Sequence, residues 1–183
     1  MGTVIPFRSS KTGQLLDHLS DLTALLREAV TISNDPRYAK QNGIVTFAGE
    51  KIEDLFFGKI TKELRETRRV ALPYLYCARH AAHCCAQLLD HQPAYWTAFE
   101  YLAKAEAAQS ADYLRQGGDT CLLLASLFPV YAERHMVNVH YYEAMGSGLY
   151  RAWHYQTGSV LGDHMADHFL EISSALKNAY RTL

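Results

Sequence analysis

Residues 117–153 read GGDTCLLLASLFPVYAERHMVNVHYYEAMGSGLYRAW, and this stretch decides the fold that we expect for the chain. An apolar segment ends at a proline, a polar turn follows, and a tyrosine-rich segment with two glycines comes next. The apolar residues recur at the three- and four-residue spacing that is typical of helices. The stretch therefore predicts a short helix that ends near Pro129 and a longer helix that begins after Asn138.

Two glycines, Gly146 and Gly148, lie inside the longer of these helices. A glycine in a helix interior costs about 1 kcal/mol relative to alanine, so a pair of them needs a reason. Close packing of another helix is one reason, since small residues occur where helices touch. Access to a ligand pocket beneath Tyr142 and Trp153 is the other. The sequence leaves both interpretations open and favours close packing.

Helical periodicity continues outward from this stretch over nearly the whole chain. An irregular arm is expected over residues 1–10, and Val45 to Phe47 is the only stretch that resembles a strand. The expected helices cover residues 10–34, 49–69, 73–91, 93–116, 119–129, 138–156 and 159–183. The sequence therefore predicts a single all-α domain over residues 1–183, a helical bundle of six to seven helices.

The last of these helices carries an apolar seam along its length. Members of the seam are three or four residues apart, which suits either a bundle core or a dimer contact. They are Leu161, Met165, Phe169, Ile172, Leu176, Ala179 and Leu183. Twelve tyrosines add side chains that are common at protein interfaces. We therefore expect a homodimer. The expected interface residues are Leu161, Met165, Ile172, Leu176 and Tyr180.

Composition and charge exclude several classes of function. Eighteen Lys and Arg oppose nineteen Asp and Glu, so no net field draws the chain to nucleic acid or to an anionic membrane. The longest apolar run, residues 121–131, is shorter than the about 20 residues that cross a bilayer. The first residues lack the apolar run of a signal peptide. The four cysteines include no Cys-x-x-Cys pair, so we expect reduced thiols in a cytoplasmic protein.

A histidine strip on the last helix is the main candidate for a metal site. His164 and His168 lie one helical turn apart and Glu171 follows three residues later, which places the three along one strip. Imidazole pairs at this spacing bind divalent transition metals such as Zn, Ni or Fe. The alternative is the polar flank of an amphipathic helix, with His168 half-buried and hydrogen-bonded. The flank is the commoner case, so metal is the second interpretation, and no other cofactor is predicted.

Two further clusters favour structural interpretations. Cys77, His80 and Cys84 lie within about 60° of one another on an apolar helix face, which favours core packing. His140 and Glu143 are spaced like half of a di-iron carboxylate site in reversed order, but they point away from the apolar face of their helix. The sequence also lacks the motifs of nucleophilic catalysis and phosphate binding, which favours a role other than catalysis without deciding it.

Residues 117–153 resemble a family of bacterial helical proteins that has no established activity. The elements that carry the resemblance are Gly118-Asp119, the apolar run from Leu122 to Phe128-Pro129, the motif Tyr141-Tyr142-x-x-Met145-Gly146, and Leu149-Tyr150. The resemblance implies a bacterial, helical protein. It implies no catalytic residue and no ligand.

The sequence alone leaves two possible functions, which belong to different classes. The first is a cytoplasmic helical protein-interaction module that acts as a homodimer. The second is a helical bundle that binds a metal or a small ligand, and which could be an enzyme, through His164, His168 and Glu171.

Overall fold

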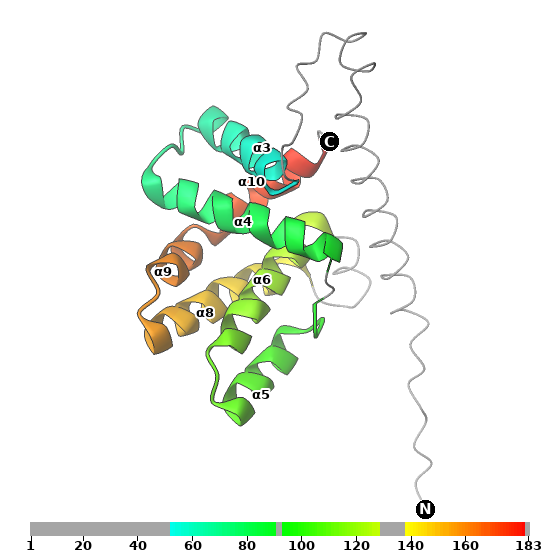
Figure 1. Ribbon diagram of the computed structural model, residues 1–183, viewed down its shortest axis with the longest axis vertical. Coiled ribbons are helices and arrows are strands. Elements are labelled where there is room, and N and C mark those ends of the chain that lie inside the picture. The colour runs from blue at the N-terminus through cyan, green and yellow to red at the C-terminus, as the bar shows by residue number, and fades with distance from the viewer. Residues whose placement is uncertain (1–51, 91–92, 129–137, 182–183) are drawn as a thin grey trace, which may run out of the picture. The chain divides into compact units, whose positions relative to one another are not determined.

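The computed structural model describes three ranges of the chain, residues 52–90, 93–128 and 138–181 (Figure 1). Three expected features lie outside these ranges. They are the arm over residues 1–10, the helix over residues 10–34 and the extended piece at residues 45–47.

The chain divides into two compact units, Met1–Gly49 and Glu50–Leu183, whereas the sequence predicts one domain. All helices over the described ranges belong to the second unit. They are α3 (Ile52–Glu66), α4 (Leu72–Asp90), α5 (Ala98–Ala108), α6 (Asp112–Leu127), α8 (Val139–Thr157), α9 (Val160–Asp167) and α10 (Phe169–Arg181). The described residues contain no strand, so the prediction of an all-α helical bundle is confirmed. None of these helices is both long and apolar enough to cross a membrane.

The residues that limit α8 and α9 have the chemistry that helix ends require. The side chain of Asn138 accepts a hydrogen bond from the Tyr141 amide, and that of Ser159 accepts one from the Gly162 amide, so the expected helix starts at residues 138 and 159 are confirmed. Gly158 ends α8 with a φ of 71°, a left-handed conformation that glycine adopts without strain.

The helix break expected before Gly117 lies elsewhere. Helix α5 ends at Gln109, which has a φ of 51°, and α6 continues through Gly117 and Gly118. A Cβ on Gly117 would lie 2.8 Å from Cβ of Tyr101, and one on Gly118 would lie 3.0 Å from the ring of Tyr150. These glycines therefore let α5 and α8 approach α6 closely, and the expectation that they terminate a helix was wrong.

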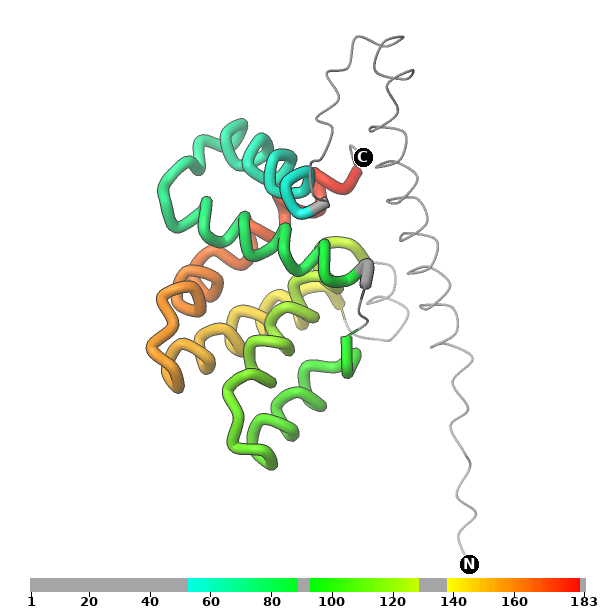
Figure 2. Tube along the Cα trace, viewed as in Figure 1, coloured from blue at the N-terminus to red at the C-terminus, as the bar shows by residue number. Residues whose placement is uncertain are grey.

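The last expected helix is interrupted. Helix α9 ends at Asp167, His168 has a φ of −113° and a ψ of 18°, and α10 begins at Phe169. Figure 2 shows the chain changing direction between α9 and α10. The apolar seam follows the bend and stays inside, because Met165 and Ile172 are 0% exposed.

The core lies between two groups of packed helices. Helix α6 packs against α5, α8 and α10, and α4 packs against α3 and α9 (Figure 1). Fully buried side chains come from α3, α6, α8 and α10, and they include Ile60, Leu122, Tyr150 and Leu176. Helix α4 also touches α6, so polar side chains of α4, α6 and α8 meet inside the bundle.

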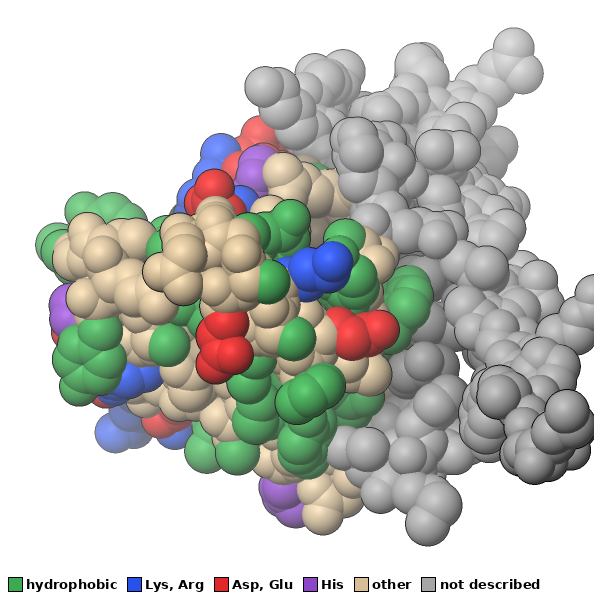
Figure 3. All heavy atoms as spheres, turned by 90° about the horizontal axis from the view of Figure 1, so that it is seen from below, with side chains coloured by type: hydrophobic (Ala, Val, Ile, Leu, Met, Phe, Trp, Pro, Cys, Tyr) green, Lys and Arg blue, Asp and Glu red, His purple; other side chains and the backbone are tan. Residues whose placement is uncertain are grey.

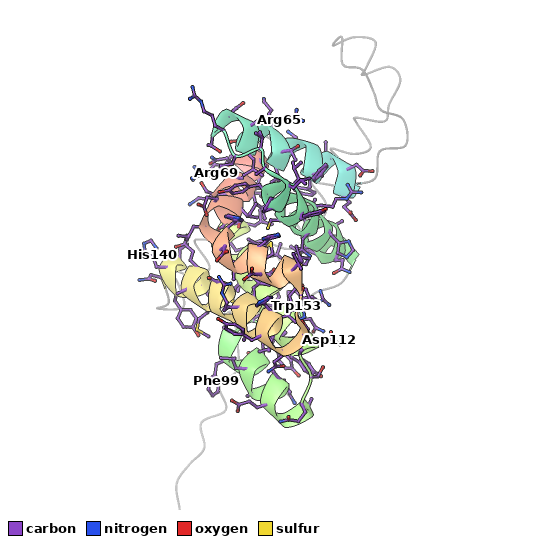
Figure 4. All side chains as sticks on the ribbon, turned by 90° about the vertical axis from the view of Figure 1, so that its left-hand side faces the viewer. Arg65, Arg69, Phe99, Asp112, His140 and Trp153 are labelled. Carbon is purple, nitrogen blue, oxygen red and sulfur yellow. The ribbon has the colours of Figure 1, made fainter. Side chains whose placement is uncertain are left out.

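The two glycines inside α8 have different surroundings. A Cβ on Gly146 would lie 2.5 Å from Cε2 of Phe169 and 2.9 Å from Cβ of Cys121. A Cβ on Gly148 would have no neighbour within 4 Å. Close packing therefore applies to Gly146 and not to Gly148. The two aromatic residues expected beside this notch serve packing, because Tyr142 is 3% exposed and Trp153 lies against Gly162 of α9 (Figure 4).

Candidate functional site

The most elaborate polar cluster of the described residues joins α4, α6 and α8. His80 lies on the inward face of α4 with Cys77, Ala81 and Cys84, because residues three and four apart share a helix face. Its Nε2 atom lies 2.7 Å from Oδ1 of Asp119 on α6. The hydroxyl of Tyr150 on α8 donates to the same oxygen at 2.6 Å. Hydrogen bonds to the Asp119 carboxylate therefore connect three helices.

Arg115 completes the surroundings of Asp119. It lies one turn earlier on α6, and its Nη1 atom donates to Oδ2 of Asp119 at 2.9 Å. The side chain of Asp119 is 14% exposed, and that of His80 is 8% exposed. Burial raises the pKa of the Asp119 carboxyl, but the hydrogen bond and charge of His80, together with Tyr150 and Arg115, outweigh burial and lower the pKa below its ordinary value. Asp119 is therefore ionised at neutral pH.

We expect the stabilisation by Asp119 to be lost in acid. The pKa of Asp119 is lower in the folded chain than the about 3.9 of an unfolded one, so its contribution is complete above that value and falls as the pH drops through the folded pKa. Denaturant unfolding of the wild type and of Asp119→Asn from about pH 2 to pH 7 measures this. The difference in free energy of unfolding should shrink below about pH 4. A difference that stays constant down to the lowest pH would contradict the assignment.

Cys84 does not form a catalytic triad with His80 and Asp119. Its Sγ atom lies 3.7 Å from Nε2 of His80, the same nitrogen that faces Asp119. A triad needs the nucleophile on one ring nitrogen and the carboxylate on the other. Burial, followed by the charge of Asp119, also raises the pKa of the Cys84 thiol well above its ordinary value. The thiolate that would act as nucleophile is therefore disfavoured.

We expect the four cysteines to be inert in the folded protein. All four are free and buried. Burial raises the pKa of Cys77 and of Cys121 to about 12. Iodoacetamide at about pH 8 should modify all four thiols in denaturant and none within minutes in the native protein. Rapid alkylation of a native thiol, located by peptide mass spectrometry, would show that the thiol is accessible.

The same cluster includes a donor set of the kind that binds transition metals. One ligand atom each from His80, Cys84 and Asp119 lies within 4.8 Å of the others. Two ligands of one tetrahedral zinc are about 3.3 Å apart for bonds of about 2.0–2.1 Å, so the 2.7 Å between Nε2 and Oδ1 fits a hydrogen bond and not shared ligation. The guanidinium of Arg115 beside Asp119 also opposes a second cation. The geometry therefore favours a hydrogen-bonded network.

A cleft of about 590 Å³ borders this network between α3, α4 and α9. Its surface is mostly apolar, and two large apolar residues at it, Tyr76 and Val160, are 59% and 64% exposed. The residues that line it are Glu53, Tyr76, Arg79, His80, His83, Val160, Leu161 and His164. The cleft is thus an apolar recess with one strongly held histidine in its wall.

The charged groups of the cleft are largely paired with each other. Arg79 lies 3.1 Å from Glu53 and 2.6 Å from Asp54. Nδ1 of His83 lies 3.1 Å from the other carboxylate oxygen of Glu53. Arg79 and His83 are therefore each paired with a carboxylate, and Glu53 is shared between them.

Two of the three residues of the predicted metal strip stay neighbours. The rings of His164 and His168 are stacked with their centroids 6.4 Å apart, and Glu171 faces Arg69 at 3.9 Å. Over the described ranges, the only trio of potential ligands that meets within 4.8 Å is the one around His80. Glu171 lies beyond the break at His168, on α10, whereas His164 lies on α9.

The other residues that the sequence suggested for a site or an interface lie on the surface, in the core or at the cleft. His140 is 86% exposed in its side chain and pairs with Glu143 at 2.8 Å on the surface of α8. In the expected interface, Met165, Ile172 and Leu176 are 0% exposed within the single chain. These three are core residues and offer no free surface to a second copy. Leu161 lines the cleft, and Tyr180 is partly exposed.

Sequence reasoning missed the network. It assigned His80 to core packing and did not relate it to Asp119 or Tyr150. One signal was present, since Asp119 follows two glycines that permit the close approach of Tyr101 and Tyr150. Comparison of the chain with protein-family models, with curated proteins and with solved structures finds no match.

Proposed function

We propose that this chain binds a small organic molecule in the cleft between α3, α4 and α9, with His80 as the polar group that orients the ligand. The observation that supports the proposal most is the fixed position of His80 in the wall of a mostly apolar cleft. The volume of about 590 Å³ lies within the range of about 300–1,000 Å³ that is usual for ligand sites.

Chemistry of the wall also supports ligand binding. Ligand sites combine apolar surface with a few well-placed polar groups. Here Asp119 and Tyr150 contact His80 and Arg115 holds Asp119, so the His80 ring loses little further freedom when a ligand binds. A binding residue needs a fixed orientation of this kind, which a histidine on the open surface lacks.

Ligand binding is favoured over self-association through the last two helices. The apolar seam that suggested a dimer packs within the chain itself, where Met165, Ile172 and Leu176 are fully buried. Figure 3 shows apolar side chains interspersed with acidic, basic and other side chains on one face of the second unit. The exposed large apolar residues of the described ranges come from several elements. They are Val70, Leu72, Tyr76, Phe99, Tyr141, Tyr155, Val160 and Leu170.

The proposal is tested with a probe that needs only an apolar cleft. We expect 4-ethylanisole to bind the full-length wild-type protein, as seen by saturation-transfer NMR. Val160→Trp should abolish the signal, because a large side chain at the cleft would occupy its space. Val160 is 64% exposed, so this change does not disturb the core.

Leu170→Trp is the matched control. Leu170 is 59% exposed on α10 and does not line the cleft, so this variant should bind the probe as the wild type does. Equal binding by the wild type and Val160→Trp would place the probe elsewhere and would overturn the proposal. The absence of binding to the wild type would do the same.

A further inference from the structure

The tautomer of His80 follows from its partners. An ionised carboxylate accepts hydrogen bonds and donates none, and Asp119 is ionised between Arg115, Tyr150 and His80. The Nε2 atom at 2.7 Å from Oδ1 of Asp119 must therefore carry the proton and donate it. In the neutral form of the ring this is the one N–H, so the Nδ1 atom of His80 then carries a lone pair and acts as an acceptor.

The residue that carries this nitrogen, His80, lines the cleft. All hydrogen bonds of His80 within the described ranges involve Nε2, which leaves Nδ1 without a partner there. Over the same ranges, every fully buried side-chain nitrogen or oxygen has a hydrogen-bond partner. Nδ1 is therefore not fully buried, and His80 is one of the residues that line the cleft. The side chain is nevertheless only 8% exposed, so only a small group can approach Nδ1 closely enough to form a hydrogen bond.

The pairing of the charged groups at the cleft disfavours an ionic ligand. Arg79 is held by Glu53 and Asp54, and His83 is held by Glu53. An anionic ligand would face the Glu53 carboxylate, and a cationic ligand would compete with Arg79 for it. A neutral ligand faces neither cost. The mostly apolar wall then selects for an apolar body.

From these observations we infer that the ligand of the cleft is a neutral, mainly apolar alcohol or phenol whose hydroxyl group donates a hydrogen bond to Nδ1 of His80. This inference rests on the proposed function, since it assigns the chemical class of the ligand to the same cleft. The recognition is directional: a hydroxyl donates to Nδ1, whereas an ether or ketone of the same shape offers only acceptors to an atom that is itself an acceptor.

The test compares two molecules that share an apolar body. The first is 4-ethylphenol, which carries a donor, and the second is 4-ethylanisole, its methyl ether, which does not. Isothermal titration at about pH 8 with the full-length protein should show tighter binding of the phenol by about tenfold, the value of one well-formed hydrogen bond. The comparison needs no variant, so it does not depend on whether a variant folds.

His80→Gln separates the acceptor from the network. The terminal amide of glutamine lies as far along the side chain as Nε2 of histidine, so it can still donate to Asp119, while the Nδ1 acceptor is removed. We expect this variant to lose the preference for the phenol over the ether that the wild type shows. Circular dichroism and its melting temperature verify that it is folded.

The outcomes separate the two proposals. Binding of neither molecule to the wild type would overturn the proposed function and this inference with it. Equal binding of both molecules would overturn the inference and leave the cleft as a ligand site. Tighter binding of the phenol that persists unchanged in a folded His80→Gln would also overturn it, because another group would then accept the hydroxyl proton.

Discussion

Asp119→Ala should be the most damaging single substitution in the polar network, and we expect it to lower the free energy of unfolding by about 3–5 kcal/mol. Asp119 accepts hydrogen bonds from His80, Tyr150 and Arg115, and bonds to a charged group contribute about 1.5–3 kcal/mol each. Arg115 is 31% exposed and can return to water, so its share is small. The Tyr150 hydroxyl and the His80 ring cannot return to water, because they are almost completely buried. Without Asp119 they would lose the carboxylate that accepts their hydrogen bonds.

Asp112→Ala is the control for this change. Asp112 is an exposed carboxylate in the first turn of the same helix, where its interaction with the helix dipole contributes at most about 1 kcal/mol. Guanidinium unfolding of both variants, followed by circular dichroism, gives the two free energies. A loss below about 1 kcal/mol for Asp119→Ala would mean that the network contributes little to the packing of α4, α6 and α8.

The second large effect concerns the glycines of α8, for which alanine substitutions should have opposite signs. Gly146→Ala should destabilise the chain by about 1–3 kcal/mol, because the new methyl group would overlap the buried ring of Phe169 and the Cβ atom of Cys121. Gly148→Ala should stabilise it by up to about 1 kcal/mol, because alanine is the better helix former and nothing lies within 4 Å.

Thermal and denaturant unfolding of the two variants measures this pair directly. Each glycine serves as the control for the other, since both lie in the same helix two residues apart. If Gly146→Ala raised the melting temperature, α8 and α10 would not be packed as closely as described. If Gly148→Ala lowered it, a neighbour would have to lie against that face.

Helix positions were predictable where short-range signals decide them. Asn138 and Ser159 cap α8 and α9 because their side chains reach backbone amides three residues ahead, and this pattern is visible in the sequence. The buried face of α3, with Phe56, Ile60 and Leu64, follows equally from apolar periodicity. These features depend on neighbours along the chain.

Features that depend on distant partners were not predictable in this way. Gly117 and Gly118 have the local signature of a helix end, but contacts with Tyr101 and Tyr150 make them helix interior. The break at His168 interrupts a seam whose apolar spacing continues through it. Tertiary packing overrides local propensity in both cases.

The candidate site was hidden for a related reason. Its members lie on three helices, at positions 80, 119 and 150, so no sequence spacing relates them. A histidine on an apolar helix face is compatible with core packing and with a supported ligand group alike. Only the distance between His80 and Asp119 distinguishes the two.

The protonation of the His80 ring is the most direct measure of the central claim. Long-range nitrogen–proton correlation NMR of protein with nitrogen-15-labelled histidine, assigned with His80→Gln, reports which ring nitrogen carries the proton. For the neutral ring, the network predicts a proton on Nε2 of His80 and a bare Nδ1 whose resonance shifts when 4-ethylphenol is added. A proton on Nδ1 of the neutral ring, or an Nδ1 resonance that does not move while the phenol binds, would contradict the role of His80 in the cleft.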